Sequence, residues 1–353
     1  MDAPARSLRG RGASTNPANR FEPFLVERVE TGLQDDEPAL TTTFYEDASE
    51  SIISYNSSPD IPFDASVNPY RGCEHGCSYC YARPFHEYLG FSAGLDFETK
   101  IMVKRRAAAL LKEELSSSMW RPQLVAMSGV TDPYQPIEKR FGLTRACLQV
   151  LLDFRNPVGV VTKNRLAARD LEIYGELARR DLCHVTVSLN SLDAELARKM
   201  EPRTSSPKGR LEMISAFASM EVPVGILIAP VIPGLNDHEI PAILKAAKQA
   251  GASYASYILL RLPLGVKDIF FDWVERLYPS KRQRIEDRLR DLRDGQLNRS
   301  TFGERFRGSG IFADQIRQLF EVSRRKAGLA AGPPDLSVAD FRRPLSPQLE
   351  LGL

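Results

Sequence analysis

The sequence lacks long apolar runs, abundant cysteine and net charge, and each shortage excludes a class of protein. None of its apolar runs reaches the about 20 residues of a transmembrane helix, and the N-terminal MDAPARSLRGRG has no apolar stretch like a secretory signal. Five cysteines in 353 residues do not make a disulfide scaffold. A net charge of +2 excludes a uniformly basic surface for nucleic acid. We therefore expect a cytoplasmic protein that has no membrane partner.

Short apolar runs alternate with longer amphipathic stretches from about residue 66 onward. Strands are expected over residues 67–70, 124–127, 158–161, 184–189, 222–229 and 255–260. Helices are expected between them, over residues 104–115, 142–154, 166–179, 208–220 and 240–250. Short strands joined by crossover helices indicate a parallel sheet.

About six such units predict an α/β fold, a partial (β/α)6 TIM-like barrel with its chemistry at the carboxyl ends of the strands. A doubly wound open sheet is the alternative topology. We divide the chain into an extended or partly disordered arm over 1–60, the barrel over 61–262, and a helical C-terminal extension and tail over 263–353.

The most specific segment is SVNPYRGCEHGCSYCYARPFHEYLG, which holds three of the five cysteines. Cys73, Cys77 and Cys80 form a C-x3-C-x2-C pattern directly after the first expected strand. Three thiolates on one loop can ligate three irons of a cubane cluster, which leaves the fourth iron open to a small ligand. Gly72 and Gly76 give the loop backbone the freedom to wrap around such a cluster.

A zinc knuckle completed by His75 or His86 is the structural alternative for this loop. Structural zinc sites usually close with four ligands, commonly as two spaced pairs, and the second pair is missing here. The cysteine pattern therefore favours an iron–sulfur cluster. The alternative hypothesis is a protein without enzymatic activity that binds nucleic acid and is stabilised by zinc.

At this loop the sequence resembles the radical S-adenosylmethionine (radical SAM) superfamily, including the aromatic Tyr79 just before the last cysteine. Over about residues 60–260 it resembles more narrowly the spore photoproduct lyase-like (DNA repair photolyase-like) branch. The segment RGRGASTNPANRFE is similar to a bacterial subgroup of that branch with no assigned reaction.

The resemblance implies two cofactors, a [4Fe-4S] cluster on the three cysteines and S-adenosyl-L-methionine (SAM) on the open iron. Reductive cleavage of SAM then gives a 5′-deoxyadenosyl radical that abstracts hydrogen from a substrate. Such chemistry needs a reductant such as flavodoxin or ferredoxin.

The resemblance also assigns SAM contacts after the second and third strands. Ser128, Thr131 and Asp132 in SGVTDPYQPIE are candidates for the amino group of SAM, and an Asp-Pro turn is their structural alternative. Lys163 in VVTKN is the candidate for the SAM carboxylate, against the ordinary reading as a solvated lysine at a rim.

Further contacts are implied after the fourth and fifth strands. Ser188 and Asn190 are candidates for the ribose hydroxyls, although they could instead cap a helix that begins near Asp193. Glu201 and Arg210 are candidates for polar atoms and the carboxylate of SAM, with surface ion pairing as the alternative. The backbone around Ala229 is expected to pack on the adenine.

One departure limits the reaction that the resemblance implies. Spore lyases have a cysteine hydrogen donor just upstream of the second-strand aspartate, whereas this chain reads AMSGVTD over residues 126–132. Thymine-dimer repair is therefore not expected, and the final hydrogen donor stays unassigned. Cys147 and Cys183 fall within a helix and at a strand start, where buried, unreactive thiols are expected.

Few features of the sequence indicate what the substrate is. Residues 281–293, KRQRIEDRLRDLR, are rich in Arg, but interleaved acids favour a salt-bridged helix over a phosphate-binding face. Arg6, Arg9 and Arg11 give the N-terminal arm a second basic cluster. DNA or RNA is the expected substrate, and a protein or a small metabolite is the alternative.

Overall fold

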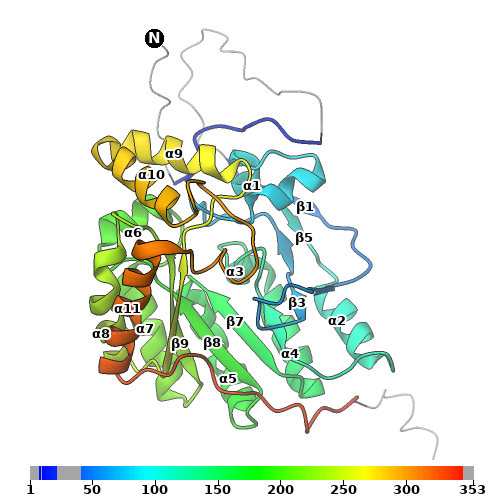
Figure 1. Cartoon of the computed structure of the whole chain (residues 1–353). Helices are drawn as coiled ribbons and strands as arrows, with labels where there is room; N and C mark the ends of the chain where they lie inside the picture. The colour runs from blue at the N-terminus through cyan, green and yellow to red at the C-terminus, as the bar shows by residue number, and fades with distance from the viewer. Residues whose placement is uncertain (1–7, 9, 22–40, 345–353) are drawn as a thin grey trace, which may run out of the picture.

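The protein was analysed as a computed structural model, which describes residues 8, 10–21 and 41–344. Its centre is a seven-stranded sheet in the order β10-β9-β8-β7-β6-β3-β2 (Figure 1). Neighbouring strands are parallel except β2, which is antiparallel to β3. The strands are β2 (Ile53–Tyr55), β3 (Ala65–Val67), β6 (Val125–Met127), β7 (Val158–Thr162), β8 (Cys183–Ser188), β9 (Val224–Val231) and β10 (Tyr254–Leu259).

Helices connect successive strands and cover the outside of the sheet (Figure 1). All six residues of β8 are buried, as expected for a parallel strand that is covered on both faces. The connecting elements are η1 (Arg83–Leu89), α1 (Leu95–Thr99), α2 (Ala107–Ser116), α3 (Glu138–Phe141), α4 (Leu143–Phe154), η2 (Arg165–Asp170), α5 (Leu171–Ala178), α6 (Ala194–Met200), α7 (Pro207–Ser219), η3 (Asp237–Glu239) and α8 (Ile240–Gln249).

Local sequence sets where several of these helices begin. The carboxylate of Asp193 caps α6 by accepting from the amides of Glu195 and Leu196 at 2.8 and 3.1 Å. Ser206 caps α7, whose first residue is Pro207, a residue suited to that position. The expected strands and helices of the barrel are therefore found close to their predicted bounds, and the partial barrel is confirmed in preference to a doubly wound sheet.

The first expected strand, over 67–70, is not continuous. β3 ends at Val67, whereas β4 (Tyr70–Arg71) belongs to a second, three-stranded sheet in the order β1-β5-β4. Pro69 stands between them, and because proline has no amide hydrogen it cannot continue the ladder. The other strands of this small sheet are β1 (Thr43–Glu46) and β5 (Lys100–Val103).

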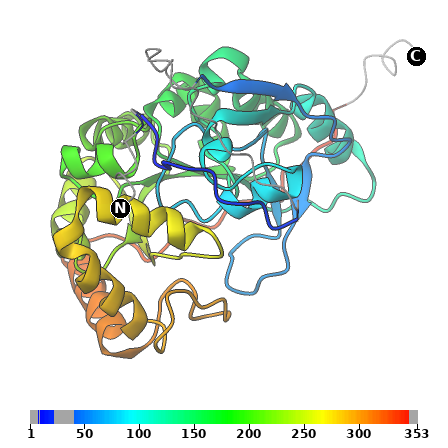
Figure 2. The same ribbon diagram turned by 90° about the horizontal axis from the view of Figure 1, so that it is seen from above.

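The predicted arm contains ordered segments that apolar periodicity did not indicate. β1 and β2 both fall within it, and residues 10–21 cross the end of the barrel beside α1 (Figure 2). Residues 1–7, 9 and 22–40 of the arm, with Arg6 and Arg9, lie outside the described residues, as does the tail over 345–353.

The C-terminal extension is helical and packs on one side of the barrel (Figure 1). α11 lies against α8, and α10 contacts both α9 and α11. Within the described residues, none of the helices combines the length and apolar character needed to cross a membrane. The elements are α9 (Val266–Leu277), η4 (Pro279–Lys281), α10 (Arg282–Asp291) and α11 (Gly310–Lys326).

Candidate functional site

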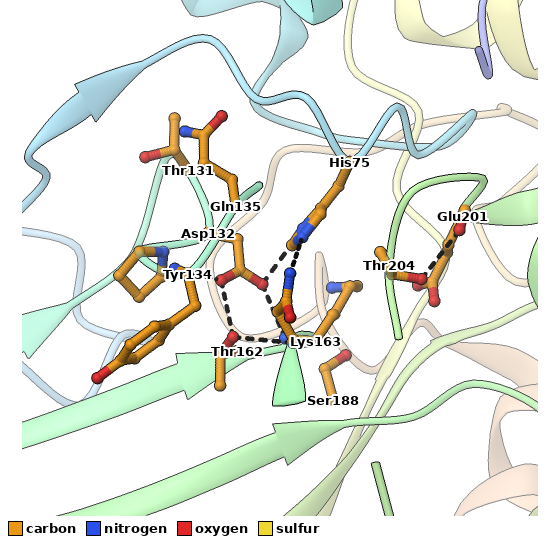
Figure 3. Close-up of polar contacts among 12 residues, drawn as sticks. His75, Thr131, Asp132, Tyr134, Gln135, Thr162, Lys163, Ser188, Glu201 and Thr204 are labelled. Atoms are coloured by element: carbon orange, nitrogen blue, oxygen red, sulfur yellow. Dashed lines mark hydrogen bonds and ion pairs between the residues drawn. The ribbon is translucent and has the colours of Figure 1, made fainter. Parts of the chain in front are cut away.

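The residues singled out from the sequence gather where parallel strands end. Ser128 follows β6, Lys163 follows β7, Ser188 ends β8, and Ala229 lies near the end of β9. Figure 3 shows Asp132, Lys163, Ser188 and Glu201 around one space, with His75 of the cysteine loop above them. The carboxyl ends of the strands thus bring distant parts of the chain to one site.

The three cysteines of the loop are free thiols. The Cys73 amide donates to the Phe97 carbonyl at 2.9 Å, and the Cys80 amide donates to the Cys77 carbonyl at 3.3 Å. Burial raises the pKa of Cys73 to about 12 and also raises the pKa values of Cys77 and Cys80. Iron held by these residues would reverse this preference, because a metal-bound thiol is deprotonated.

Glycine allows this loop to fold tightly. Gly76 has a φ of 65°, which other residues rarely adopt, and a Cβ there would lie 2.7 Å from Glu98 Oε2. The same carboxylate accepts hydrogen bonds from the amides of Gly12 and Ala13 at 3.1 and 2.9 Å. The Glu98 carboxylate and the backbone of Gly12 and Ala13 therefore pack together against the loop at Gly76.

A fully buried Arg83 lies beneath the loop and pairs with Glu98. Its Nε and Nη2 atoms donate to the Cys77 carbonyl at 3.1 and 2.8 Å, and its Nη1 donates to the carbonyls of Ala93 and Gly94. These charge-assisted hydrogen bonds fix the backbone at the middle cysteine.

Asp132 connects the loop after β6 to the end of β7 (Figure 3). Its Oδ1 accepts from the Thr162 hydroxyl and the Tyr134 amide at 2.7 and 2.8 Å, and its Oδ2 accepts from the Lys163 amide at 2.7 Å. His75 Nδ1 lies 3.4 Å from the same Oδ2. The carboxylate therefore holds together three segments around the site.

Lys163 is a half-buried cation in the middle of the site. Burial lowers the pKa of its ammonium, but Glu201, Cys77 and Asp132 raise it more, so that the net pKa lies above the ordinary value. Within the described residues its Nζ has no hydrogen bond or ion pair, so the ammonium is available to an anionic group.

Glu201 and Arg210 form a fully buried ion pair rather than the surface pair considered as their alternative. The other donors of Arg210 are used inside the protein: Nε reaches the Ser205 carbonyl at 2.9 Å, and Nη1 reaches the Ser188 carbonyl at 2.8 Å. Glu201 Oε1 also accepts from the Tyr79 hydroxyl. Arg210 therefore supports the end of β8, and its predicted contact with SAM stays a prediction.

Asn190 lies beside this pair and donates to Glu201 Oε1 at 3.2 Å. Its own Oδ1 is buried and has no hydrogen-bond partner among the described residues. Neither Asn190 nor Ser188 caps α6, because Asp193 does so. A buried, unpaired acceptor at this point fits a ligand that brings a hydroxyl or an ammonium group.

The other residues predicted to contact SAM form hydrogen bonds within the protein. The Thr131 hydroxyl donates to the Tyr70 carbonyl at 3.2 Å, and the Ser128 hydroxyl donates to the Thr131 carbonyl at 3.3 Å. The Ala229 carbonyl accepts from the Ser188 hydroxyl at 3.3 Å. These residues line the strand ends, and their roles toward SAM stay predictions.

Sequence reasoning missed several polar residues that position the site. The Gln135 side chain donates to the Gly72 carbonyl at 3.1 Å and accepts from the Glu74 amide at 2.9 Å. Asn236 donates to the carbonyls of Asn190 and Pro230 at 2.7 and 3.0 Å. Gln135 lies within the SGVTDPYQPIE segment, but its role could not be read from it, because its partners are more than 60 residues away. Asn236 likewise bonds Asn190, which is 46 residues away.

The positions of the two histidines do not favour the zinc alternative. The His75 ring contacts Asp132 and lies 3.3 Å from Asn164 Nδ2, while His86 packs against Phe91 and Phe97. Across the described ranges, no three His, Cys, Asp or Glu side chains are arranged to hold a single metal ion. The donor set that fits the loop is three thiols, each able to bind its own iron of a cubane.

Comparison with known proteins then decides the family. Residues 67–247, which include the cysteine loop and most of the strand ends, match the radical SAM superfamily. The chain belongs to the radical SAM superfamily. An uncharacterised protein of Mycobacterium tuberculosis is 36% identical to it over 253 residues, 70% of this chain and 74% of that protein.

Other relatives of this radical SAM enzyme are more distant. An uncharacterised Methanocaldococcus jannaschii protein is 28% identical over 173 residues, 49% of this chain and 62% of that protein. A spore photoproduct lyase variant with bound AdoMet and dinucleoside spore photoproduct has a similar fold, with a TM-score of 0.58 and 16% identity. That alignment covers 82% of this chain and 80% of the lyase.

Proposed function

We propose that this radical SAM enzyme holds a [4Fe-4S] cluster on Cys73, Cys77 and Cys80 and cleaves SAM reductively. The observation that carries the proposal is the position of three free thiols on one loop, two of them buried, beside the Lys163 ammonium, which has no partner in the described part of the chain. When bound and reduced, the cluster supplies the electron that cleaves the sulfonium of SAM and gives a 5′-deoxyadenosyl radical.

The surrounding residues divide the remaining tasks. Lys163 binds the carboxylate of SAM, and the buried Asn190 oxygen accepts a hydrogen bond from a ribose hydroxyl of SAM. Asp132 and the Glu201–Arg210 pair hold the strand ends in position and exclude water. A one-electron reductant such as flavodoxin or ferredoxin is the proposed partner.

The decisive experiment is anaerobic reconstitution with iron and sulfide, followed by dithionite and SAM. We expect about four irons per chain and the release of 5′-deoxyadenosine. Replacing Cys77 with Ala should lower the iron content and abolish 5′-deoxyadenosine formation, because Cys77 supplies one of three iron ligands.

Cys183→Ala is the matched control, since the Cys183 thiol is also buried but donates to the Tyr174 carbonyl away from the loop. It should retain iron and activity. Full activity of the Cys77→Ala protein, or one zinc per chain without sulfide, would contradict the proposal.

A further inference from the structure

A second cation without an internal partner lies at the rim of the barrel. Arg261 follows β10, and its guanidinium carbon lies 4.9 Å from the centre of the Phe306 ring and 5.8 Å from that of Tyr81. Within the described residues, these ring contacts are accompanied by no hydrogen bond or ion pair, and the Nε atom is buried and unpaired.

The neighbouring arginines differ because their charges or donors are already used. Arg305 pairs with Asp60 across the rim, and its Nε donates to Asp60 Oδ2 at 2.8 Å. Arg293 donates to the carbonyls of Leu260 and Arg305 at 2.8 and 3.0 Å. Since an unpaired, partly buried charge is costly, Arg261 is best explained by a ligand that brings the missing negative charge.

Tyr81 connects Arg261 to the proposed radical site. It follows Cys80 directly, and its hydroxyl donates to the carbonyl of Gly129 in the loop after β6. Its ring centre lies 5.8 Å from the guanidinium carbon of Arg261. A ligand on Arg261 therefore lies next to the cysteine loop.

The same rim exposes aromatic rings. Tyr81 is 44% exposed and Phe302 is 55% exposed, and the Arg305 guanidinium carbon lies 4.9 Å from the centre of the Phe302 ring. Figure 2 shows the loop that carries Phe302, in orange, beside the blue loop that carries Asp60. Flat rings next to arginine are the groups that stack unpaired nucleobases.

The basic helix that the sequence emphasised is a weaker candidate. Arg282 and Arg290 of α10 both pair with Glu286, and Arg288 lies 3.4 Å from Asp237. Three of its arginines are therefore paired with acids within the protein, as the interleaved acids indicated, whereas Arg261 is not.

We propose that Tyr81, Arg261, Phe302, Arg305 and Phe306 form a rim site that binds a single strand of nucleic acid. Arg261 takes a backbone phosphate, and the exposed rings of Tyr81 and Phe302 stack the adjoining bases. This inference rests on the proposed function, because the strand held here is the substrate of the adjacent radical site.

Fluorescence anisotropy of the reconstituted full chain with labelled dT12 and U12 tests the rim site. Arg261→Gln should weaken binding of the preferred strand about tenfold. The slope of log K against log salt should fall by about 0.7, the loss of one phosphate contact. Arg317→Gln, which removes an exposed arginine of α11, is the matched control and should change neither quantity.

Phe302→Ala supplies a second variant that removes only an exposed ring. It should weaken binding severalfold without changing the salt slope, since a base is no longer stacked. Iron content and circular dichroism verify that both variants are folded.

Two results overturn the rim site. One is wild-type protein that binds neither strand although it cleaves SAM, which leaves the proposed function intact. The other is equal binding by wild type and Arg261→Gln. A third result would refute the proposed function and leave the rim site intact. In that result, the reconstituted wild-type protein binds a strand through Arg261 but does not cleave SAM.

Discussion

Two cations near the cysteine loop, Lys163 and Arg210, are used in opposite ways. Arg210 is fully buried and directs its donors to Ser188, Ser205 and Glu201 inside the protein. Lys163 is half-buried, and its ammonium has no partner among the described residues. A ligand carboxylate therefore gains a full counter-charge from Lys163, whereas Arg210 would first have to break its existing bonds.

We predict that Lys163→Ala weakens SAM binding roughly 10- to 100-fold, because a charge-assisted hydrogen bond contributes about 1.5–3 kcal/mol. Iron content should stay near the wild-type value, since Lys163 is not a cluster ligand. Equilibrium dialysis with labelled SAM on reconstituted protein measures the affinity. Lys208→Ala, which removes an 88% exposed lysine, is the control, and unchanged affinity in Lys163→Ala would refute its role.

The location of these residues at the site could be predicted from the sequence, but most of their contacts could not. Lys163 and Ser188 could be located because each follows or ends an expected strand, and parallel strands bring their carboxyl ends together. The burial of the Glu201–Arg210 pair could not, since it depends on how α7 packs against the end of β8. The positioning residues Gln135 and Asn236 were missed for the same reason.

At the scale of elements, residues 10–21 belong to the site rather than to a separate arm. Gly12 and Ala13 donate to Glu98, Ser14 reaches Asp272 of α9 at 2.7 Å, and Asn16 reaches Asp96 of α1 at 3.0 Å. The segment therefore fastens the cysteine loop to elements on both sides of it. The apolar pattern of the sequence did not indicate this role, because the contacts are polar and made by backbone amides and short polar side chains.

The close packing of Gly12 against the cysteine loop allows a test of whether this segment supports the loop. A Cβ at Gly12 would lie 1.9 Å from the Gly76 carbonyl oxygen, a backbone atom of the cysteine loop. We expect Gly12→Ala to displace the segment, lower the melting temperature by an amount equivalent to about 1–3 kcal/mol, and reduce iron incorporation.

Gly265→Ala is the matched control, because a Cβ there meets no atom within 4 Å and its φ is −66°. Thermal melting and iron analysis of the two variants decide the matter. Equal melting temperatures and equal iron contents would show that the Gly12 contact is not needed.

The bounds of strands and helices could be predicted from the sequence where the pattern of buried residues determines them. β8 and α8 were found within one residue of their expected bounds, because a short, fully buried strand and an amphipathic helix have distinct patterns. The small sheet of β1, β5 and β4 was not expected, since its strands are two to four residues long and pair across distant segments.

For the whole molecule, the dependence of stability on pH includes the cost of protonating buried histidines. His184 lies on β8, where its ring packs edge-on against Tyr254, and His86 lies in η1 against Phe97. Burial lowers the pKa of each histidine from 6.5 to about 4. Between these two pH values the unfolded chain binds protons that the folded protein does not, so stability falls as the pH falls through this window.

We predict that the melting temperature of the wild-type protein declines steadily from pH 6.5 to pH 4.5. His184 alone contributes a loss on the order of 2 kcal/mol at pH 5, by linkage between its two pKa values. His184→Gln should be less stable at pH 7 because it loses ring packing, but its melting temperature should fall less steeply with acid. His238→Gln, which replaces an exposed histidine, should keep the wild-type slope. Since acid acts on a bound cluster equally in all three proteins, parallel slopes for wild type and His184→Gln would refute the assignment.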